Sequence, residues 1–456
     1  MNHKELPFLF QLRSSKCFVF STAATGLFTS TFVHSILFPL SPFIVARIRN
    51  IEQNSDPSED LTSHVDSNSR DTGILVALYA VGLLVGSPIF GWLGDRIAQR
   101  RLPMLLGTAA SIAANILFML STTYPMLLAA RLLQGISNAC VWTMCLCLVA
   151  DNWPREQLGV QMGKLIGFYP LGMMIGLPAG GHKAPFIASM LLSGIDFLMR
   201  LIVIERSSSP ASWFADEPPR ETEKTNSVTW LQLLRQPRLI VSLLLTSTVA
   251  TVMSAFEPTL SMRMAQEWQF NAAGCSLIVL AYMIPSILAS VVCGWLCDRL
   301  GTKIVALCSL LFATPSCLLI GFPDHERGSF WILVPFLVMG GITIAGCQAP
   351  VFPEIAKVVD TSNGHTQSSD GLARSYSLFN AAYGVGMCVG PILGGYLYAW
   401  IGFFWLCTLL SGLFLCFIPL AYFFIGDSRA LIERNRLNAI DTVKDMEKSS
   451  LYTHDA

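Results

Sequence analysis

The chain has 456 residues, of which 53% are hydrophobic and 13% are charged. A soluble domain usually has about 25% charged residues, so this composition excludes an ordinary soluble protein and indicates that lipid surrounds most of the chain. The 30 basic and 30 acidic residues cancel, and without a basic excess we expect no nucleic-acid partner. No CxxC pair stands beside His or carboxylate residues at a zinc-like spacing, so no metal site is expected.

Twelve stretches of the chain are long and apolar enough to cross a membrane. A spanning helix needs about 20 mostly apolar residues, and helices are required because the bilayer core offers the backbone no water to hydrogen-bond. A β-barrel would instead show alternating segments of about ten residues. We therefore predict an all-α membrane protein with twelve transmembrane helices, in which the last two are divided only at Trp400 to Gly402. In chain order the spans are expected at residues 17–46, 73–94, 103–122, 125–150, 162–181, 184–204, 239–262, 274–295, 303–322, 330–353, 375–398 and 401–425.

The distribution of Lys and Arg predicts the orientation of the chain. Cytoplasmic loops of membrane proteins carry an excess of these residues, and most of those outside the spans fall on the side of the N-terminus. The apolar run after residues 1–16 is too long for a signal peptide, so we expect it to remain as the first span. An even number of spans then leaves both termini in the cytoplasm.

The spans fall into two groups of six. The connection between them contains Ser207 to Pro210 and the pair Pro218-Pro219, which is typical of a flexible linker. We predict a cytoplasmic N-terminus at 1–16, a six-helix bundle at 17–205, a linker at 206–238, a second bundle at 239–426 and a cytoplasmic tail at 427–456.

Two motifs occur once in each half, at corresponding positions. A loop motif follows the second span of each half, as Gly91-Trp-Leu-Gly-Asp95-Arg96 and as Gly294-Trp-Leu-Cys-Asp298-Arg299. A glycine–proline motif, whose glycines let helices approach closely, lies in the fifth span of each half. Its residues are Gly172, Gly176, Pro178, Gly180 and Gly181 in the first half and Gly386, Gly390, Pro391, Gly394 and Gly395 in the second. This repeat predicts two pseudo-symmetric six-helix bundles with a substrate site between them.

With these motifs the chain resembles the major facilitator superfamily. More narrowly, it is similar to the twelve-span drug:proton antiporters, in the fungal branch that is similar to vesicular amine transporters. The resemblance covers residues 17–425, and it is carried by the loop and glycine–proline motifs, Arg131-x-x-Gln134-Gly135 and Ala255-Phe256-Glu257-Pro258-Thr259. It implies a secondary active transporter, not an enzyme, that exports a small organic molecule such as a secondary metabolite or a xenobiotic by alternating access. It also implies no cofactor beyond a proton gradient.

The loop motifs place Asp95 and Asp298 at cytoplasmic helix ends, beside Arg96 and Arg299. A carboxylate there can pair with an arginine or with the positive N-terminus of a neighbouring helix. The resemblance implies that these loops gate the transporter through a contact that forms in only one conformation. The alternative is ordinary interfacial charge. The first copy departs from the family pattern at Ala98, where a glycine is usual.

Arg131 is a charged residue inside the fourth span, and Gln134 and Asn138 lie on the same helix face. A buried arginine costs about 3 kcal/mol or more unless it is paired or hydrated, and such residues usually face a bundle interior. The resemblance implies a role in proton coupling or substrate orientation. The alternative is an arginine whose side chain reaches back to the outer interface.

Glu257, in the seventh span, is the carboxyl group that we expect to take part in proton coupling. A carboxyl group buried in a membrane can bind and release protons near neutral pH, and Pro258 interrupts the helical hydrogen bonding beside it. The alternative is a glutamate near the outer interface that only pairs with Arg263.

Residues of the expected cavity indicate the charge of the substrate. Vesicular amine transporters and many of their relatives carry an Asp in the first span and another in the eleventh. At these places this chain has the segment Thr29 to His34, which contains no Asp, and Asn380. Without these anions, an uncharged or weakly acidic substrate fits better than an amine. His34 can change its charge near neutral pH, although it can equally be a packing residue. The expected cavity-lining side chains are His34, Gln134, Trp142, Tyr169, Glu257, Tyr282, Gln348, Asn380 and Tyr383.

Three other functions stay open at this point. A nutrient uptake permease would share the fold, although the resemblance links the glycine–proline motif to antiporters. A membrane enzyme would need a catalytic cluster, and the only dense one, at 324–326, is expected in an external loop. A non-transporting receptor would not need Arg131 or Glu257. We expect a monomer that binds a small-molecule substrate in the lipid bilayer, in the plasma membrane or alternatively in a vacuolar or vesicular membrane.

Overall fold

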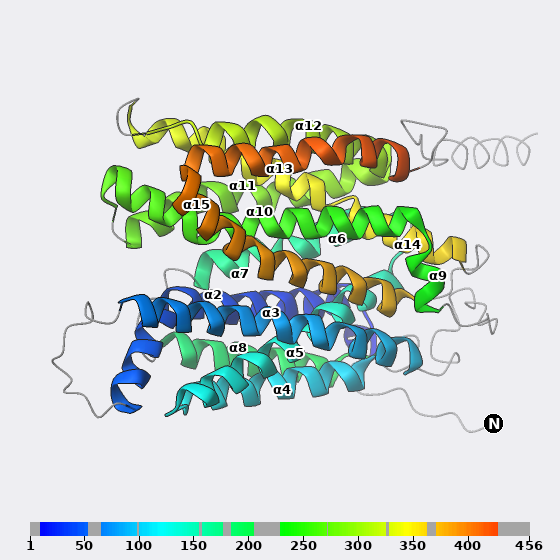
Figure 1. The fold of residues 1–456 in the computed structure, drawn as a ribbon. Helices are drawn as coiled ribbons and strands as arrows, with labels where there is room; N and C mark the ends of the chain where they lie inside the picture. Colours follow the sequence, from blue (N-terminus) through cyan, green and yellow to red (C-terminus); the bar gives the residue numbers. More distant parts are fainter. Residues whose placement is uncertain are drawn as a thin grey trace, which may run out of the picture.

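The protein is built from helices that run side by side along one direction (Figure 1). Within the residues that the structure describes, the chain is helical and has no strand, which confirms the predicted all-α class. The computed structural model describes residues 10–52, 65–97, 100–154, 157–176, 184–204, 229–270, 272–324, 328–362 and 371–426.

The first half of the chain contributes six spans, preceded by the single turn α1 (Phe10–Arg13). They are α2 (Lys16–Glu52), α3 (Val65–Arg96), α4 (Arg101–Met119), α5 (Tyr124–Asn152), the pair α6 (Leu158–Ile166) and α7 (Phe168–Gly176), and α8 (Ala184–Ile202). The fifth span thus starts earlier than predicted and is divided in two. Pro170 explains the division, because it has no N–H to donate to the carbonyl of Ile166.

The second half also contributes six spans. It contains α9 (Trp230–Leu234), α10 (Pro237–Trp268), α11 (Ala272–Leu300), α12 (Thr302–Ile320), η4 (Phe330–Ile332), α13 (Leu333–Gln348), α14 (Val351–Ser362) and α15 (Leu372–Phe424). The last two spans are both in α15 and are divided at Gly402, whose φ of 80° suits glycine. The tenth span is predicted as one helix to residue 353, but it ends at Gln348 because Pro350 and Pro353 cannot donate helical hydrogen bonds.

Together these helices make the predicted twelve passes. Eight described helical segments are long and apolar enough to cross a membrane on their own. One of them, α15, makes two passes, and the remaining three are α2, the α6–α7 pair and α8. The outward faces are apolar: Trp400 is 82% exposed and Leu288 is 69% exposed. Such faces match a surrounding of lipid tails.

The two halves lie on opposite sides of the molecule, coloured blue to cyan and green to red in Figure 1. They meet through two equivalent helix pairs. The first part of α15 packs against α3, and α11 packs against α6 and α7. Each pair joins the second span of one half to the fifth span of the other, so the contact between the halves is itself duplicated.

The predicted domain boundaries fall mostly where the chain is not described. The linker at 206–238 is described only from residue 229, where α9 and the start of α10 lie, and the N-terminal segment only from residue 10. The tail at 427–456 lies outside the described residues. The boundaries therefore stay predictions.

The glycine–proline motif of the first half lies where α7 touches α2. A Cβ on Gly172 would overlap the hydroxyl of Thr31, and a Cβ on Gly176 would overlap the hydroxyl of Ser35. Only glycine permits this approach. The other motif residues of this half, Pro178, Gly180 and Gly181, lie outside the described residues.

The equivalent motif of the second half lies where α15 touches α10. A Cβ on Gly390 would overlap the hydroxyl of Ser254, and one on Gly394 would lie 3.0 Å from the carbonyl oxygen of Ala255. Pro391 stands between these two glycines inside α15. Both halves therefore hold their fifth span against their first span through the same kind of contact.

We expect Gly386→Ala to lower the midpoint of thermal unfolding of the purified protein. A Cβ there would overlap Ala250 and the backbone carbonyl of Ser247, and overpacking of this kind costs about 1–3 kcal/mol. Gly395→Ala on the same helix is the matched control, because its Cβ would meet no atom within 4 Å, and alanine favours a helix by up to about 1 kcal/mol. Equal midpoints for the two variants would contradict the proposed contact.

Candidate functional site

Two adjoining chambers lie between the halves, near the middle of the helices. The inner chamber has about 500 Å³ of space not filled by protein atoms, its open side included, and has Tyr282, Ser290 and Gln348 in its wall. The outer chamber has about 350 Å³ on the same measure and includes His34 and Asn380. Inner and outer serve only as names, because both chambers come within about three turns of the end that carries the loop motifs: Ser290 from the end of α11, and Asn380 from the start of α15.

Three aromatic side chains border both chambers and separate them: Trp142, Tyr169 and Tyr383. The hydroxyl of Tyr383 donates a hydrogen bond to that of Tyr169 at 2.9 Å, and the Trp142 and Tyr169 rings are 5.7 Å apart. Because Tyr169 belongs to the first half and Tyr383 to the second, this aromatic partition also joins the halves. The amide of Asn380 reinforces the joint by donating to Thr143 at 2.9 Å.

Three residues predicted from the sequence to take part in proton coupling or substrate binding line the outer chamber. His34 and Asn380 line the outer chamber, and Tyr383 lines both chambers. The imidazole ring of His34 lies 4.5 Å from the ring of Tyr79. Gln134, in contrast, does not line either chamber; its amide donates to Asn115 at 2.7 Å.

Arg131 points into the first bundle and is only 1% exposed, so its side chain does not reach the outer interface. Its guanidinium donates to Gln134 at 3.3 Å and lies over the rings of Tyr79 and Phe118, at 5.8 and 5.6 Å from their centroids. Among the described residues it has no carboxylate within ion-pair distance. Arg131 does not line a chamber itself, but it contacts Tyr79, which lines the outer chamber.

Glu257 is half-buried on α10, within electrostatic range of the hydroxyls of Tyr169, Tyr282 and Tyr383. Glu257 therefore lies near the aromatic partition but, contrary to the prediction from the sequence, it is not among the residues that line either chamber. It does not pair with Arg263, which instead forms an ion pair with Glu267 one turn further along the same helix.

The two loop motifs form matching contacts between the halves. Asp95 at the end of α3 accepts hydrogen bonds from the backbone amides of Ala373 and Arg374, at 2.9 and 3.1 Å, where α15 begins. The side chain of Arg374 adds an ion pair at 3.4 Å. A carboxylate at a helix N-terminus is stabilised by the free amides and by the helix dipole.

Asp298 makes the equivalent contact in the opposite direction. It lies at the end of α11, in the second half, and accepts hydrogen bonds from the amides of Gly159 and Val160 at 2.8 and 2.7 Å. These amides open α6, in the first half. We call the Asp95 and Asp298 contacts the two latches. Together they close the end of the molecule that carries the loop motifs.

The glycines and arginines of the loop motifs have different places. A Cβ on Gly91 would overlap Ser377 of α15, and a Cβ on Gly294 would overlap the backbone of Gly159, so both glycines allow the halves to approach. Arg96 and Arg299 do not cross between the halves. Their guanidinium groups lie over tryptophans of their own helices, Trp92 at 4.8 Å and Trp295 at 4.5 Å.

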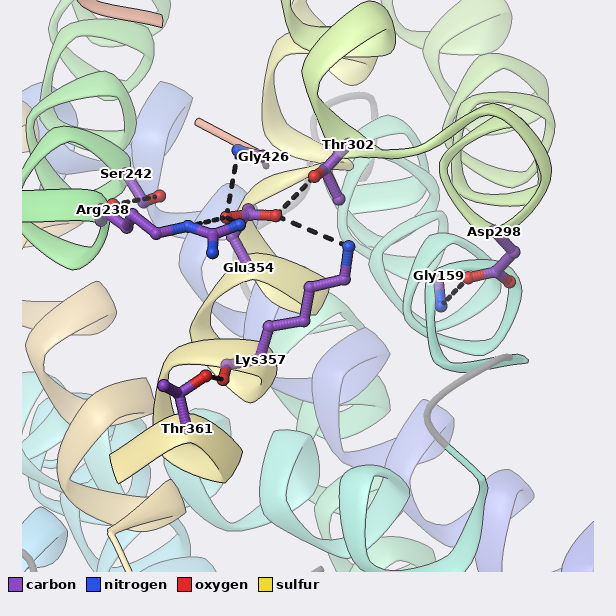
Figure 2. A network of polar contacts seen from close by, with 9 residues as sticks. All are labelled: Gly159, Arg238, Ser242, Asp298, Thr302, Glu354, Lys357, Thr361 and Gly426. Carbon is purple, nitrogen blue, oxygen red and sulfur yellow. Dashed lines mark hydrogen bonds and ion pairs between the residues drawn. The ribbon is translucent and has the colours of Figure 1, made fainter. Parts of the chain in front are cut away.

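Glu354, which the sequence analysis missed, is the centre of a further polar network near the Asp298 latch (Figure 2). It is 1% exposed. Its carboxylate accepts from the guanidinium of Arg238 at 3.2 Å and from the hydroxyl of Thr302. The backbone amide of Gly426 also donates to it, at 3.3 Å, and Lys357 lies at 3.8 Å. Glu354 thereby ties the ends of α10, α12 and α15 to α14.

The first half has a comparable buried pair. Asp151, near the end of α5, forms an ion pair with Arg100, just before α4, and Arg100 also donates to the carbonyl of Gly94 at 3.1 Å. Like Glu354, Asp151 closely follows an apolar span. A single carboxylate at the same end of the fourth and the tenth span was the sequence signal that could have identified both acidic residues, though not their partners.

We expect Asp298→Asn to speed hydrogen exchange at the amides of Gly159 and Val160, measured by mass spectrometry on the protein in nanodiscs. Hydrogen bonds to a charged group contribute about 1 to 2 kcal/mol more than those to a neutral one, so the exchange should quicken by about fivefold to thirtyfold. Asp324→Asn, near the opposite end of the helices, is the control and should leave these amides unchanged. Unchanged exchange in Asp298→Asn would show that the latch contributes nothing.

A family model described as Major Facilitator Superfamily matches the chain over residues 23–256 and 242–439. An uncharacterised MFS-type transporter of Schizosaccharomyces pombe is 27% identical, covering 84% of this chain and 90% of the relative. The MFS-type transporter ppzB of Metarhizium rileyi is 24% identical, over 87% of this chain and 92% of the relative. The synaptic vesicular amine transporter of Bos taurus is 26% identical, over 88% of this chain and 75% of the relative. The crystal structure of the human organic anion transporter MFSD10 shares the fold with a TM-score of 0.65 at 18% identity, covering 89% of this chain and 99% of that one. The chain therefore belongs to the major facilitator superfamily of multi-pass membrane transporters.

Proposed function

We propose that this protein is a proton-coupled exporter of a small organic molecule that works by alternating access. The observation that carries the proposal is the position of Glu257, a carboxyl group near the aromatic partition. Among the described residues it has no cation within ion-pair distance. A charged carboxylate without a partner is costly inside a protein, so a proton is the simplest neutralising partner while the cavity is closed.

The latches support the alternating-access part of the proposal. They close the end that the distribution of Lys and Arg assigns to the cytoplasm, and each consists of a few hydrogen bonds from one bundle to the other. Rocking of one bundle against the other would break them and open the chambers to that side. Protonation of Glu257 and binding of the substrate would then bias the same movement from the centre of the molecule.

The names of two similar proteins suggest charged substrates, an amine and an organic anion. The wall of the inner chamber has no charged side chain among its described residues, and Asn380 rather than a carboxylate stands in the outer chamber. These observations support an uncharged or weakly acidic substrate, such as a secondary metabolite or a xenobiotic. The substrate itself can be identified by comparing the metabolites of cells that lack the protein with those of cells that overproduce it.

The membrane in which the protein works is part of the proposal. Export from the cell requires the plasma membrane, whereas the similarity to vesicular amine transporters supports an internal compartment. Fluorescence microscopy of the tagged protein distinguishes the two locations. Either location provides a proton gradient to drive export from the cytoplasm.

We expect Glu257→Gln to abolish accumulation driven by a pH gradient while it preserves substrate exchange at equal pH on both sides. Glutamine keeps the size and the hydrogen-bonding groups but cannot carry the proton. The measurement is flux of the identified metabolite in proteoliposomes, with and without a protonophore. The matched control is Glu267→Gln, since Glu267 lies on the same helix and pairs with Arg263.

Flux of the unaltered protein that ignores a collapsed proton gradient would end the antiport proposal. Full gradient-driven accumulation by Glu257→Gln would remove this residue from the coupling. A loss in both glutamate variants would indicate a shared structural effect on α10 and would equally count against a specific role for Glu257.

A further inference from the structure

Tyr282 lines the inner chamber, and its hydroxyl is a buried polar group that the described part of the protein does not satisfy. Tyr282 is 8% exposed, and its hydroxyl has no hydrogen-bond partner among the described residues. Buried tyrosine hydroxyls usually find a partner. A hydroxyl kept unsatisfied beside a cavity is suited to the polar atom of a ligand.

Two glycines of α13 fix the place of this tyrosine. A Cβ on Gly341 would overlap the backbone carbonyl of Tyr282, and a Cβ on Gly340 would lie 3.2 Å from its ring. These glycines therefore let α11 and α13 approach closely at this level. The ring is held before any ligand arrives, which lowers the entropy that binding has to overcome.

The rest of the wall is uncharged and largely apolar. Met253 and Ile344 supply apolar surface, while Gln348 and Ser286 supply neutral polar groups. A charged ligand would lose its hydration here without gaining an ion pair from a described wall residue. Glu257 lies nearby, but in the proposed function its carboxyl group holds the proton.

Aromatic rings give the chamber a preference for flat molecules. Trp142, Tyr169 and Tyr383 form its boundary with the outer chamber, and the rings of Trp142 and Tyr383 are nearly parallel, at 19°. Such rings favour offset stacking or edge contacts with an aromatic partner over contact with a saturated one.

Resting on the proposed transport function, we infer that the inner chamber binds uncharged, flat aromatic molecules, and that the hydroxyl of Tyr282 donates a hydrogen bond to an acceptor on them. The aromatic partition supplies the stacking surface. Tyr282 fixes the orientation of the ligand, and the absence of charge from the described wall selects against ions.

The test is equilibrium dialysis of coumarin, a flat uncharged lactone, against the purified full-length protein in nanodiscs without a pH gradient. We expect saturable binding. Saturated octahydrocoumarin should bind about threefold to tenfold more weakly because it cannot stack. Coumarin-3-carboxylate and the N-methylquinolinium cation should bind about tenfold or more weakly because of their charge.

Tyr282→Phe should weaken coumarin binding by about threefold to tenfold, the contribution of one hydrogen bond. Since the hydroxyl has no partner among the described residues, the variant should keep or raise the midpoint of thermal unfolding, whereas a structural hydroxyl would lower it. Tyr396→Phe is the control, because Tyr396 is 67% exposed on the outer face, and it should change neither value.

The inference would be overturned if coumarin did not bind saturably, or if the cation or the anion bound more strongly than coumarin. It would also be overturned if Tyr282→Phe kept the full affinity for coumarin. A lowered midpoint in Tyr282→Phe would do the same. These binding results do not depend on whether transport is coupled to protons, because the dialysis is done without a pH gradient. Intact coumarin binding with gradient-independent flux would overturn only the proton coupling.

Discussion

Inside a bilayer, the backbone N–H and C=O groups have to find their partners within the protein, because hydrocarbon offers no hydrogen bonds, and a charged side chain is costly unless it too is paired. This constraint explains why the chain is helical, and it also explains where its few buried charges lie. Asp196 and Arg200 of α8 pair at 2.9 Å, fully enclosed. Arg131 rests on aromatic rings and on Gln134. Buried polar residues thereby determine which helix faces pack together. The apolar surfaces that face lipid make no specific contact of this kind.

Because the chain contains an internal repeat, the same kind of helix contact occurs once in each half. Within the first half, the hydroxyl of Ser35 donates to the carbonyl of Gly172 at 3.3 Å; within the second, that of Ser254 donates to the carbonyl of Gly386 at 3.1 Å. Each bond joins the first span of a half to its fifth. The chambers follow this symmetry in their helices but not in their side chains: the first, second and fourth spans of one half and the fifth span of the other line each of them. The inner one takes Tyr282 and Gln348 from the second half, and the outer one takes His34 from the first. The scaffold is thus symmetric while the chemistry of the cavity is not.

The number of spans and the repeated motifs could be predicted from the sequence because bilayer thickness fixes helix length and glycines at regular spacing mark close packing. Cavity residues such as Tyr169, Tyr282 and Gln348 were also predictable, as polar or aromatic residues within apolar runs. The network around Glu354 was not, since Arg238, Thr302 and Gly426 come from distant parts of the chain. Arg131 lies behind Tyr79 and not in the cavity wall. This position could not be predicted either, because it depends on the rotation of the neighbouring helices about their axes. Breaks such as the one before Pro350 were overlooked because hydropathy does not register a missing N–H.

Each latch has its carboxylate in one half and its amides in the other, and the two run in opposite directions. A rigid separation of the bundles at this end must release both together, so their free energies add within one equilibrium and their equilibrium constants multiply. Two contacts of about 1.5–3 kcal/mol each would bias the conformations by roughly a hundredfold to ten-thousandfold. The two latches thus act as one two-state switch. Small fluctuations leave it closed, and a free-energy change in the central cavity can open it.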